Sequence, residues 1–220
     1  MNRFDTPAPV TTVLNIPAGR VNIVAADRTD TTVHVRPADP SKGRDVKAAE
    51  QTLVTYADGA VRIEVPAKNQ YVGPSGAIEV TVELPAGSHI EANTAGAELS
   101  CAGRLGDVAF EGAYRNIRID EAAGVSLTAV DGDVEIGRLG GPARISTPRG
   151  DIRIAEAVRG TVELRTQRGD IVVGAAAGVS ACLDAGTSHG RVGNGLKNTG
   201  TPELDIRATT SQGDIVARSL

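Results

Sequence analysis

The chain has 220 residues, a formal net charge of −4 and no tryptophan, and aromatic residues make up 2% of it. An acidic chain without a Lys/Arg cluster and with few rings for base stacking is not expected to bind nucleic acid. Residues 1–10 lack the apolar core of a signal peptide, and no apolar run reaches the length of a membrane span. We therefore expect a cytoplasmic protein without a membrane span, although a chain whose leader had been removed would read the same way.

The first third of the chain is rich in strand patterns but has no repeat. After a flexible N-terminus at residues 1–11, residues 12–87 alternate apolar and polar side chains, and Asp58-Gly59 is typical of a two-residue hairpin turn. Residues 45–51 fit either a helical turn or a strand, and residues 37–43 and 67–76 read as exposed loops. We expect this region to be a β-rich cap that continues a stack of coils. The candidate strands are Thr12–Ile16, Arg20–Ala25, Thr31–Arg36, Thr52–Tyr56, Ala60–Val65 and Ala77–Leu84.

Residues 88–220 contain a repeat built around a Gly-Asp pair. The clearest copies place glycine at positions 132, 150, 169, 190 and 213, at intervals of 18, 19, 21 and 23 residues. An alternating strand precedes each glycine and a second strand follows it, while Asn116 stands in the glycine's place in a weaker copy upstream. A unit of this length cannot bury its apolar face alone, so such units stack. The sequence therefore predicts an all-β fold, a parallel β-solenoid with coils of about 18–23 residues.

The Gly-Asp pair is predicted to form the corner between the two strands of a coil. Glycine can adopt the positive φ of a tight corner, and the following aspartate can accept hydrogen bonds from nearby backbone amides. These structural turn residues are Gly132, Asp133, Gly150, Asp151, Gly169, Asp170, Gly190, Gly213 and Asp214.

If the coils stack in sequence order, their apolar residues form two ladders through the core. Leu183 and Ile206 lie seven residues before their glycines, whereas Leu164 lies five before its own. Two inserted residues are therefore expected at the corner of each of the last two coils. The ladder before the corner is Leu127, Ile145, Leu164, Leu183 and Ile206, and the ladder after it is Val134, Ile152, Ile171, Val192 and Ile215.

In this arrangement the final coil presents an open strand edge, which natural proteins usually blunt or pair. We expect this edge to mediate self-association into a dimer or a longer stack, with an unknown protein partner as the other candidate. The predicted edge consists of Asp214, Ile215, Val216, Ala217 and Arg218.

No residue pattern indicates a catalytic or metal site, so no catalytic residue, metal or cofactor is assigned. Stacked Asp side chains about 4.8 Å apart could serve acid–base chemistry or calcium binding, but the Gly-Gly-x-Gly-x-Asp pattern of calcium-binding β-rolls is absent, which favours a turn role.

His34, His89 and His189 lack metal-ligand spacing. Cys101 and Cys182 read as small buried hydrophobes, and a disulfide would require the stack to bring them together. Cys182 and His189 belong to no recognisable catalytic motif.

The recurring Leu/Ile-x-Thr-x-x-Gly-Asp-Ile pattern, as in residues 145–152, resembles the bacterial "putative adhesin" family of β-strand repeat domains. The resemblance extends from about Thr12 to Leu220 and includes Ile-Pro-Ala-Gly-Arg-Val-Asn-Ile at residues 16–23. It implies a β-helix-like fold, and it implies neither an enzyme activity nor catalytic residues.

These observations favour a non-enzymatic scaffold or interaction module that self-associates through its C-terminal coil. An adhesin-like module that binds glycan or an envelope polymer is the alternative, and a carbohydrate-active β-helix enzyme is the second alternative. The scarcity of aromatic rings, which usually stack on sugars, argues against both carbohydrate hypotheses.

Overall fold

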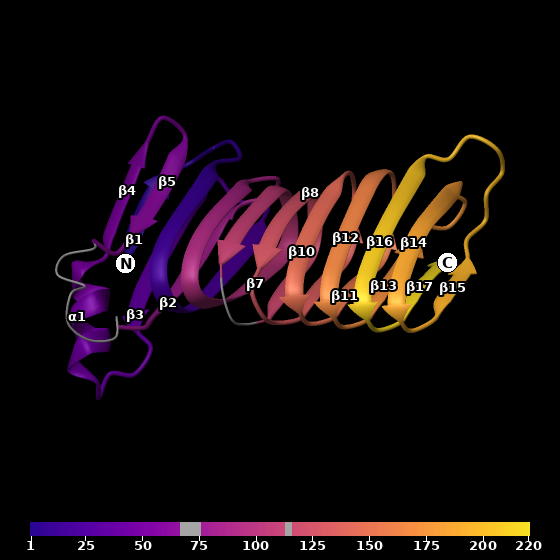
Figure 1. The fold of residues 1–220 in the computed structure, drawn as a ribbon. Helices are drawn as coiled ribbons and strands as arrows, with labels where there is room; N and C mark the ends of the chain where they lie inside the picture. Colours follow the sequence, from indigo (N-terminus) through magenta and orange to yellow (C-terminus); the bar gives the residue numbers. More distant parts are fainter. Residues whose placement is uncertain (67–75, 113–115) are drawn as a thin grey trace. The chain divides into compact units, whose positions relative to one another are not determined.

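The chain, described by a computed structural model at residues 1–66, 76–112 and 116–220, forms two compact units, Met1–Arg115 and Asn116–Leu220 (Figure 1). The division after residue 87 that the sequence suggests stays a prediction. No helix among the described residues is long and apolar enough to cross a membrane. Most of the predicted loop at residues 67–76 lies outside the described residues.

The first unit is built around a long strand that pairs with parallel neighbours on both sides. β2 pairs along residues 11–24 with β7, and on its other side with β5 and then β6. The predicted strands at residues 12–16 and 20–25 are therefore one continuous strand. The elements of this unit are β1 (Asn2–Asp5), β2 (Thr11–Ala26), β3 (Asp30–Pro37), α1 (Gly43–Gln51), β4 (Leu53–Ala57), β5 (Ala60–Glu64), β6 (Ile78–Pro85) and β7 (His89–Gly112).

Antiparallel strands flank this parallel core, so the fold is mixed and not strictly parallel. β3 pairs antiparallel with β6, and β1 with β3, although residues 2–5 were expected to be flexible. β4 and β5 form the predicted hairpin, because Asp58 and Gly59 adopt φ angles of 51° and 73°. The undecided segment at residues 45–51 is part of α1, where Asp45 Oδ1 accepts a hydrogen bond from the Ala77 amide at 3.0 Å.

The second unit consists of stacked coils, each contributing one strand to each of two parallel sheets. The first sheet, before the corners, runs β8–β10–β12–β16–β14. The second sheet, after the corners, runs β8–β9–β11–β13–β17–β15. The strands are β8 (Ile117–Ala129), β9 (Val134–Leu139), β10 (Ala143–Arg149), β11 (Ile152–Ala157), β12 (Gly160–Arg168), β13 (Ile171–Ala175), β14 (Ala181–His189), β15 (Val192–Gly195), β16 (Leu204–Gln212) and β17 (Ile215–Ser219).

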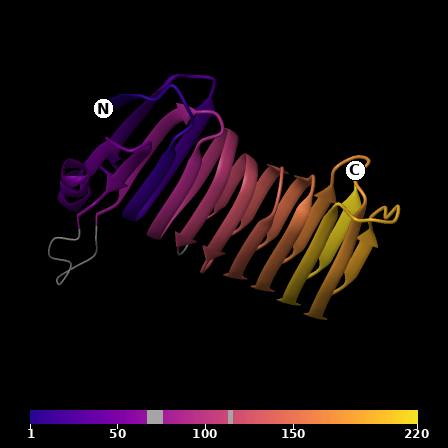
Figure 2. The same cartoon turned by 90° about the horizontal axis from the view of Figure 1, so that it is seen from above.

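The order of the last two coils in the stack is reversed relative to the sequence. β16 lies between β12 and β14, and β17 lies between β13 and β15, as Figures 1 and 2 show. The ladder after the corner therefore runs Val134, Ile152, Ile171, Ile215 and Val192. The prediction of sequential stacking was wrong for these coils.

The predicted two-residue insertion at the last corners is also absent. Leu164 lies opposite Ala208, and Val162 lies opposite Ile206, so the last strands are shifted by two residues against the expected ladder. Arg168 faces Gln212 directly before the glycine, and the corners have equal length. The longer repeat intervals instead reflect the connecting segments at residues 176–180 and 196–203, at the far end of each coil.

Candidate functional site

The Gly-Asp corners of the second unit form a hydrogen-bonded ladder. Gly150 and Gly169 have φ angles of 124° and 147°, a region that side chains disfavour. A Cβ on Gly169 would lie 2.1 Å from the Gly150 carbonyl oxygen, so glycine is also required by the close approach of adjacent coils. Gly132 and Gly213 share the positive φ, whereas Gly190 does not. Four of these five glycines therefore have the positive φ that the predicted corner role requires.

Each aspartate of the ladder accepts a hydrogen bond from a backbone amide of the neighbouring coil. The Asp151 amide donates to Asp133 Oδ1, and the Asp170 amide to Asp151 Oδ1, both at 2.8 Å. The Asp214 amide continues the series to Asp170 Oδ1, and the Arg191 amide to Asp214 Oδ1, again at 2.8 Å. The carboxylates therefore serve the stacking of coils.

Asn116 begins the same ladder, but in the aspartate's position. The Asp133 amide donates to Asn116 Oδ1 at 3.3 Å, and the pairing of Ile117 with Val134 aligns Asn116 with Asp133. The sequence interpretation had placed Asn116 in the glycine's position. Among the described residues, no group of three or more His, Cys, Asp or Glu side chains is arranged to hold a metal ion.

The structure does not bring Cys182 and His189 together. Cys182 and His189 lie near opposite ends of β14, about 23 Å apart for an extended strand. Cys101 is buried, and both cysteines are free thiols. Cys182 is half-buried, with Sγ 3.5 Å from Asp205 Oδ1. Burial and the nearby Asp205 carboxylate raise the pKa of the Cys182 thiol, which makes it a poor nucleophile at neutral pH.

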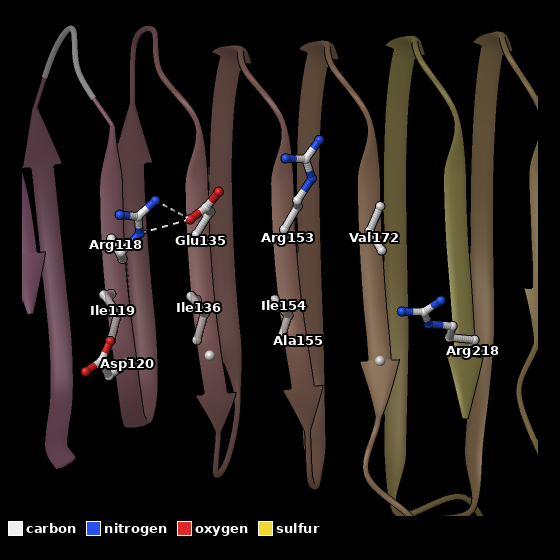
Figure 3. Close-up of a pocket in the computed structure, with 12 residues that line it drawn as sticks. Arg118, Ile119, Asp120, Glu135, Ile136, Arg153, Ile154, Ala155, Val172 and Arg218 are labelled. Carbon is white, nitrogen blue, oxygen red and sulfur yellow. Dashed lines mark hydrogen bonds and ion pairs between the residues drawn. The ribbon is translucent and has the colours of Figure 1, made fainter. Parts of the chain in front are cut away.

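The outer face of the second sheet carries a groove of about 430 Å³ (Figure 3). Its floor is formed by Gly137, Ala155 and Gly174 on the neighbouring strands β9, β11 and β13. A Cβ on Gly174 would lie 2.2 Å from the Ala155 carbonyl oxygen, and one on Gly137 would lie 2.5 Å from that of Asp120. The small residues therefore have a structural cause, since the strands approach closely here.

Charged side chains border this groove. Arg118 bonds Glu135 at 2.8 Å, and Arg153 donates to Asp151 Oδ2 at 2.7 Å. Arg218 enters from β17 and points over the floor in Figure 3. It makes no ion pair within the part of the chain that the structure describes. The groove can thus offer a guanidinium group to an anionic ligand.

The open edge of the second unit lies at β14 and β15, and not at residues 214–218. Ile215, Val216 and Ala217 of β17 pair with β13 on one side and with β15 on the other, so the predicted edge was wrong. The reason is the insertion of the last coil, which makes β17 an interior strand. Asp214 and Arg218 are interior to the stack for the same reason.

Apolar residues are exposed at this open end. Val192 aligns with Ile215 in the core ladder, yet Val192 is 47% exposed and Ile215 is 1% exposed. Leu183 aligns with the fully buried Ile206 but is itself half-buried. Both side chains face the interior between the sheets and are uncovered because no coil of the described residues follows them in the stack. The growing repeat intervals were the one sequence signal for this arrangement, and they had been assigned to the wrong corner.

Stacked parallel coils with bonded Gly-Asp corners place this chain in the class of β-solenoid repeat proteins. Residues 13–219 match the model of the Toastrack DUF4097 family, and the chain belongs to that family. This membership confirms the family resemblance that the repeats had indicated.

Two solved structures are similar to this chain over nearly its whole length. One is a "putative cell adhesion protein" from Clostridium sporogenes, with 12% identity, coverage of 100% of this chain and 98% of the other, and a TM-score of 0.40. Another is a "putative adhesin" from Bacteroides fragilis, with 15% identity, coverage of 98% and 95%, and a TM-score of 0.46. The search of curated proteins found no match.

Proposed function

We propose that this protein is a non-enzymatic interaction module that joins a second copy of the chain through the open end formed by β14 and β15. The single observation that carries the proposal is the pair of strands that lack a neighbour on their outer side. β14 pairs with β16 and β15 with β17, and neither has a second strand partner among the described residues. Unpaired strand edges are templates for pairing with another chain.

The length of β14 distinguishes the open end from the other edges. β1 and β4 are also edge strands, but they have 4 and 5 residues, whereas β14 has 9. Short edge strands are one of the ways in which proteins avoid association. β15 is itself short, with 4 residues, and the Ala181 amide at the start of β14 donates to the Lys197 carbonyl at 3.0 Å, but the rest of β14 has no such protection. The open end also exposes the core residues Val192 and Leu183.

A second copy fits this end better than a single extended peptide. The end offers two edges, one from each sheet, which lie about 10 Å apart in packed sheets. Another open end carries the same two edges at the same separation. A two-fold axis perpendicular to the sheets would pair β14 with its copy and β15 with its copy, both antiparallel. The exposed Val192 side chains would then be buried at the junction.

Light scattering on a sizing column over a concentration series tests the proposal. The wild type should show a dimer fraction that rises with concentration. Val192→Lys should remain monomeric, because a charge would be buried at the junction. Val216→Lys is the matched control, since Val216 is 40% exposed on the neighbouring strand but lies on the outer face and not at the end. A wild type that stays monomeric throughout, or a Val192→Lys variant that dimerises equally, would overturn the proposal.

The second candidate function is adhesin-like binding of an acidic polymer along the groove of Figure 3. It is favoured by Arg218, whose guanidinium group lies over the floor without an ion pair in the described residues. Arg218→Gln should weaken binding to acidic glycans on an array, and Arg144→Gln, which alters an arginine that pairs with Glu163 on the other sheet, should not. Equal binding by both variants would remove this candidate.

A further inference from the structure

The coil formed by β16 and β17 occupies a slot whose two walls are both made by earlier residues. One wall is the coil of β12 and β13, and the other is the coil of β14 and β15 (Figures 1 and 2). The chain therefore leaves one position in the stack empty after β13, builds the outer coil, and returns through residues 196–203 to fill the gap.

The outer coil is joined to the stack through the inserted coil. β14 pairs with β16 alone and β15 with β17 alone, within residues 1–66, 76–112 and 116–220. Leaving the slot empty would expose both walls and leave the outer strands without a strand partner. The slot must therefore be filled, but its walls do not determine which chain supplies the coil.

The inserted coil makes apolar contacts that any copy of this sequence would reproduce. Leu204, Ile206 and Ala208 of β16 are at most 1% exposed, as are Ile215 and Ala217 of β17. They complete the core between the walls. Their burial removes large apolar side chains from water, which strongly favours an occupied slot.

The corner of the inserted coil adds polar recognition on both sides. The Asp214 amide donates to Asp170 on one wall, and Asp214 Oδ1 accepts from the Arg191 amide on the other, both at 2.8 Å. The hydroxyl of Thr187 donates to the Gly213 carbonyl at 3.0 Å, and that of Thr210 to the Gly169 carbonyl at 3.1 Å. The slot therefore selects a coil with Gly-Asp at this position.

The segment that connects the outer coil to the inserted coil is exposed, and its hydrogen bonds to the stack lie at Lys197, Thr199 and Glu203. Residues 197–203 are exposed, and no helix or strand is formed between Gly195 and Leu204. The Lys197 amide donates to Ser219 Oγ at 2.9 Å, and the Thr199 amide to Ser180 Oγ at 3.1 Å. Such a segment can serve as a hinge, since it can adopt a second path without breaking core contacts.

We propose that a second copy of this chain can supply the inserted coil, giving a dimer in which residues 204–220 of each protomer fill the slot of the other. Each protomer keeps every contact of the slot, and only the path of residues 196–203 changes. Exchange of an identical element is a low-cost route to a dimer. This coil-exchanged dimer differs from the end-to-end dimer, because the open end at β14 and β15 takes no part in it.

A chain-to-chain disulfide between slot wall and inserted coil tests the exchange. Cys182 on β14 is the register partner of Asp205 on β16, with Sγ 3.5 Å from the carboxylate. One full-length chain carries Cys182→Ala and Asp205→Cys, and the other keeps the native Cys182. The two are unfolded, mixed in equal amounts, refolded at high concentration and oxidised. A disulfide between the two chains requires β16 of one to lie beside β14 of the other.

The expected result is a covalent hybrid dimer, with about half of the exchanged dimers containing one chain of each kind if pairing is random. Adding Gly213→Ala to the chain that carries Asp205→Cys should reduce the hybrid several-fold. A Cβ there would lie 2.0 Å from the Gly169 carbonyl oxygen at a φ of 146°. Adding Val216→Thr, which changes an exposed outer-face residue, should leave the yield unchanged.

Two outcomes and one control separate the two kinds of dimer. A hybrid that forms equally when both chains also carry Val192→Lys supports coil exchange independently of the open end. Oxidised monomer from a single chain that carries Asp205→Cys and keeps Cys182 establishes that the disulfide can form. If that monomer forms efficiently but the co-refolded mixture gives no hybrid, coil exchange is overturned, while the end-to-end proposal stands on its own test.

Discussion

The backbone amide of Asp214 donates a 2.8 Å hydrogen bond to the Asp170 carboxylate, which lies 44 residues earlier in the chain. The coil between them in sequence, β14 and β15, is not between them in space. This bond therefore joins the inserted coil to the wall of its slot, in the same ladder that links Asp133, Asp151 and Asp170.

Replacing Asp170 should weaken this link. Asp170→Ala leaves the Asp214 amide without its acceptor, and the free energy of unfolding should fall by about 1 kcal/mol. Urea denaturation followed by circular dichroism measures the change. Asp170→Asn keeps an oxygen acceptor at the same place and should lose less. Equal losses in the two variants would show that this hydrogen bond does not contribute.

Gly169, the corner glycine that precedes Asp170, should tolerate no side chain. Gly169→Ala combines a φ of 147° with a Cβ 2.1 Å from the Gly150 carbonyl oxygen, and should cost about 2–4 kcal/mol of stability. Gly186→Ala is the control, because a Cβ there meets no atom within 4 Å and the φ is not positive. Thermal unfolding of both variants measures the loss of stability. An unchanged melting temperature for Gly169→Ala would show that a side chain is tolerated at this corner.

The ion pairs of Arg28 with two carboxylates in the first unit predict a dependence of stability on pH. Arg28 hydrogen-bonds the carboxylates of Asp30 and Glu83, and these bonds lower the pKa of each carboxyl below its usual value of 3.8 or 4.5. A lowered pKa in the folded state stabilises the fold above the usual value, and this stabilisation is lost as the pH falls through the folded pKa. The urea midpoint should therefore decline below about pH 4.

Arg28→Gln provides the matched test of that dependence. The variant should be less stable than the wild type at pH 7, and the difference should shrink between about pH 4 and pH 2 as the carboxylates become protonated. Arg62→Gln, on the exposed face of β5, should leave the pH profile of the wild type unchanged. A constant difference between Arg28→Gln and the wild type at all pH values would exclude this linkage.

The Cys182 thiol should react slowly with a thiol reagent, and Asp205 should be part of the cause. Its pKa is raised by burial first and by the Asp205 carboxylate second. Asp205→Asn removes the negative charge, so the rate of modification at pH 8 should increase a few-fold. Cys182→Ala identifies the signal, because the buried Cys101 should not react in the folded protein. An unchanged rate would assign the slow reaction to burial alone.

Much of the local structure could be predicted from the sequence. Alternating residues such as Val162 and Leu164 predicted strands with one buried face, and Asp58-Gly59 predicted a hairpin that the φ angles confirm. The Gly-Asp pairs predicted corners. These features depend on the period of the pattern and on the φ angle that glycine allows, and both are properties of a few neighbouring residues.

The register and the order of the last coils could not be predicted in this way. Ile206 lies opposite Val162 and not Leu164, and a shift of two residues keeps every side chain on its own face. The apolar pattern is therefore satisfied by either register. Neither the pattern nor the corner motif distinguishes one neighbouring coil from another.

The sequence by itself determined that this protein is a stack of β-coils with Gly-Asp corners, because the repeat specifies the geometry of each coil. Tertiary structure alone decided that β16 and β17 lie inside the stack and that β14 and β15 form its open end. The physical reason is that backbone hydrogen bonds between parallel strands are the same for any pair of coils of equal shape. The choice of neighbour therefore depends on packing and on the path of the connecting segments, which no local pattern records.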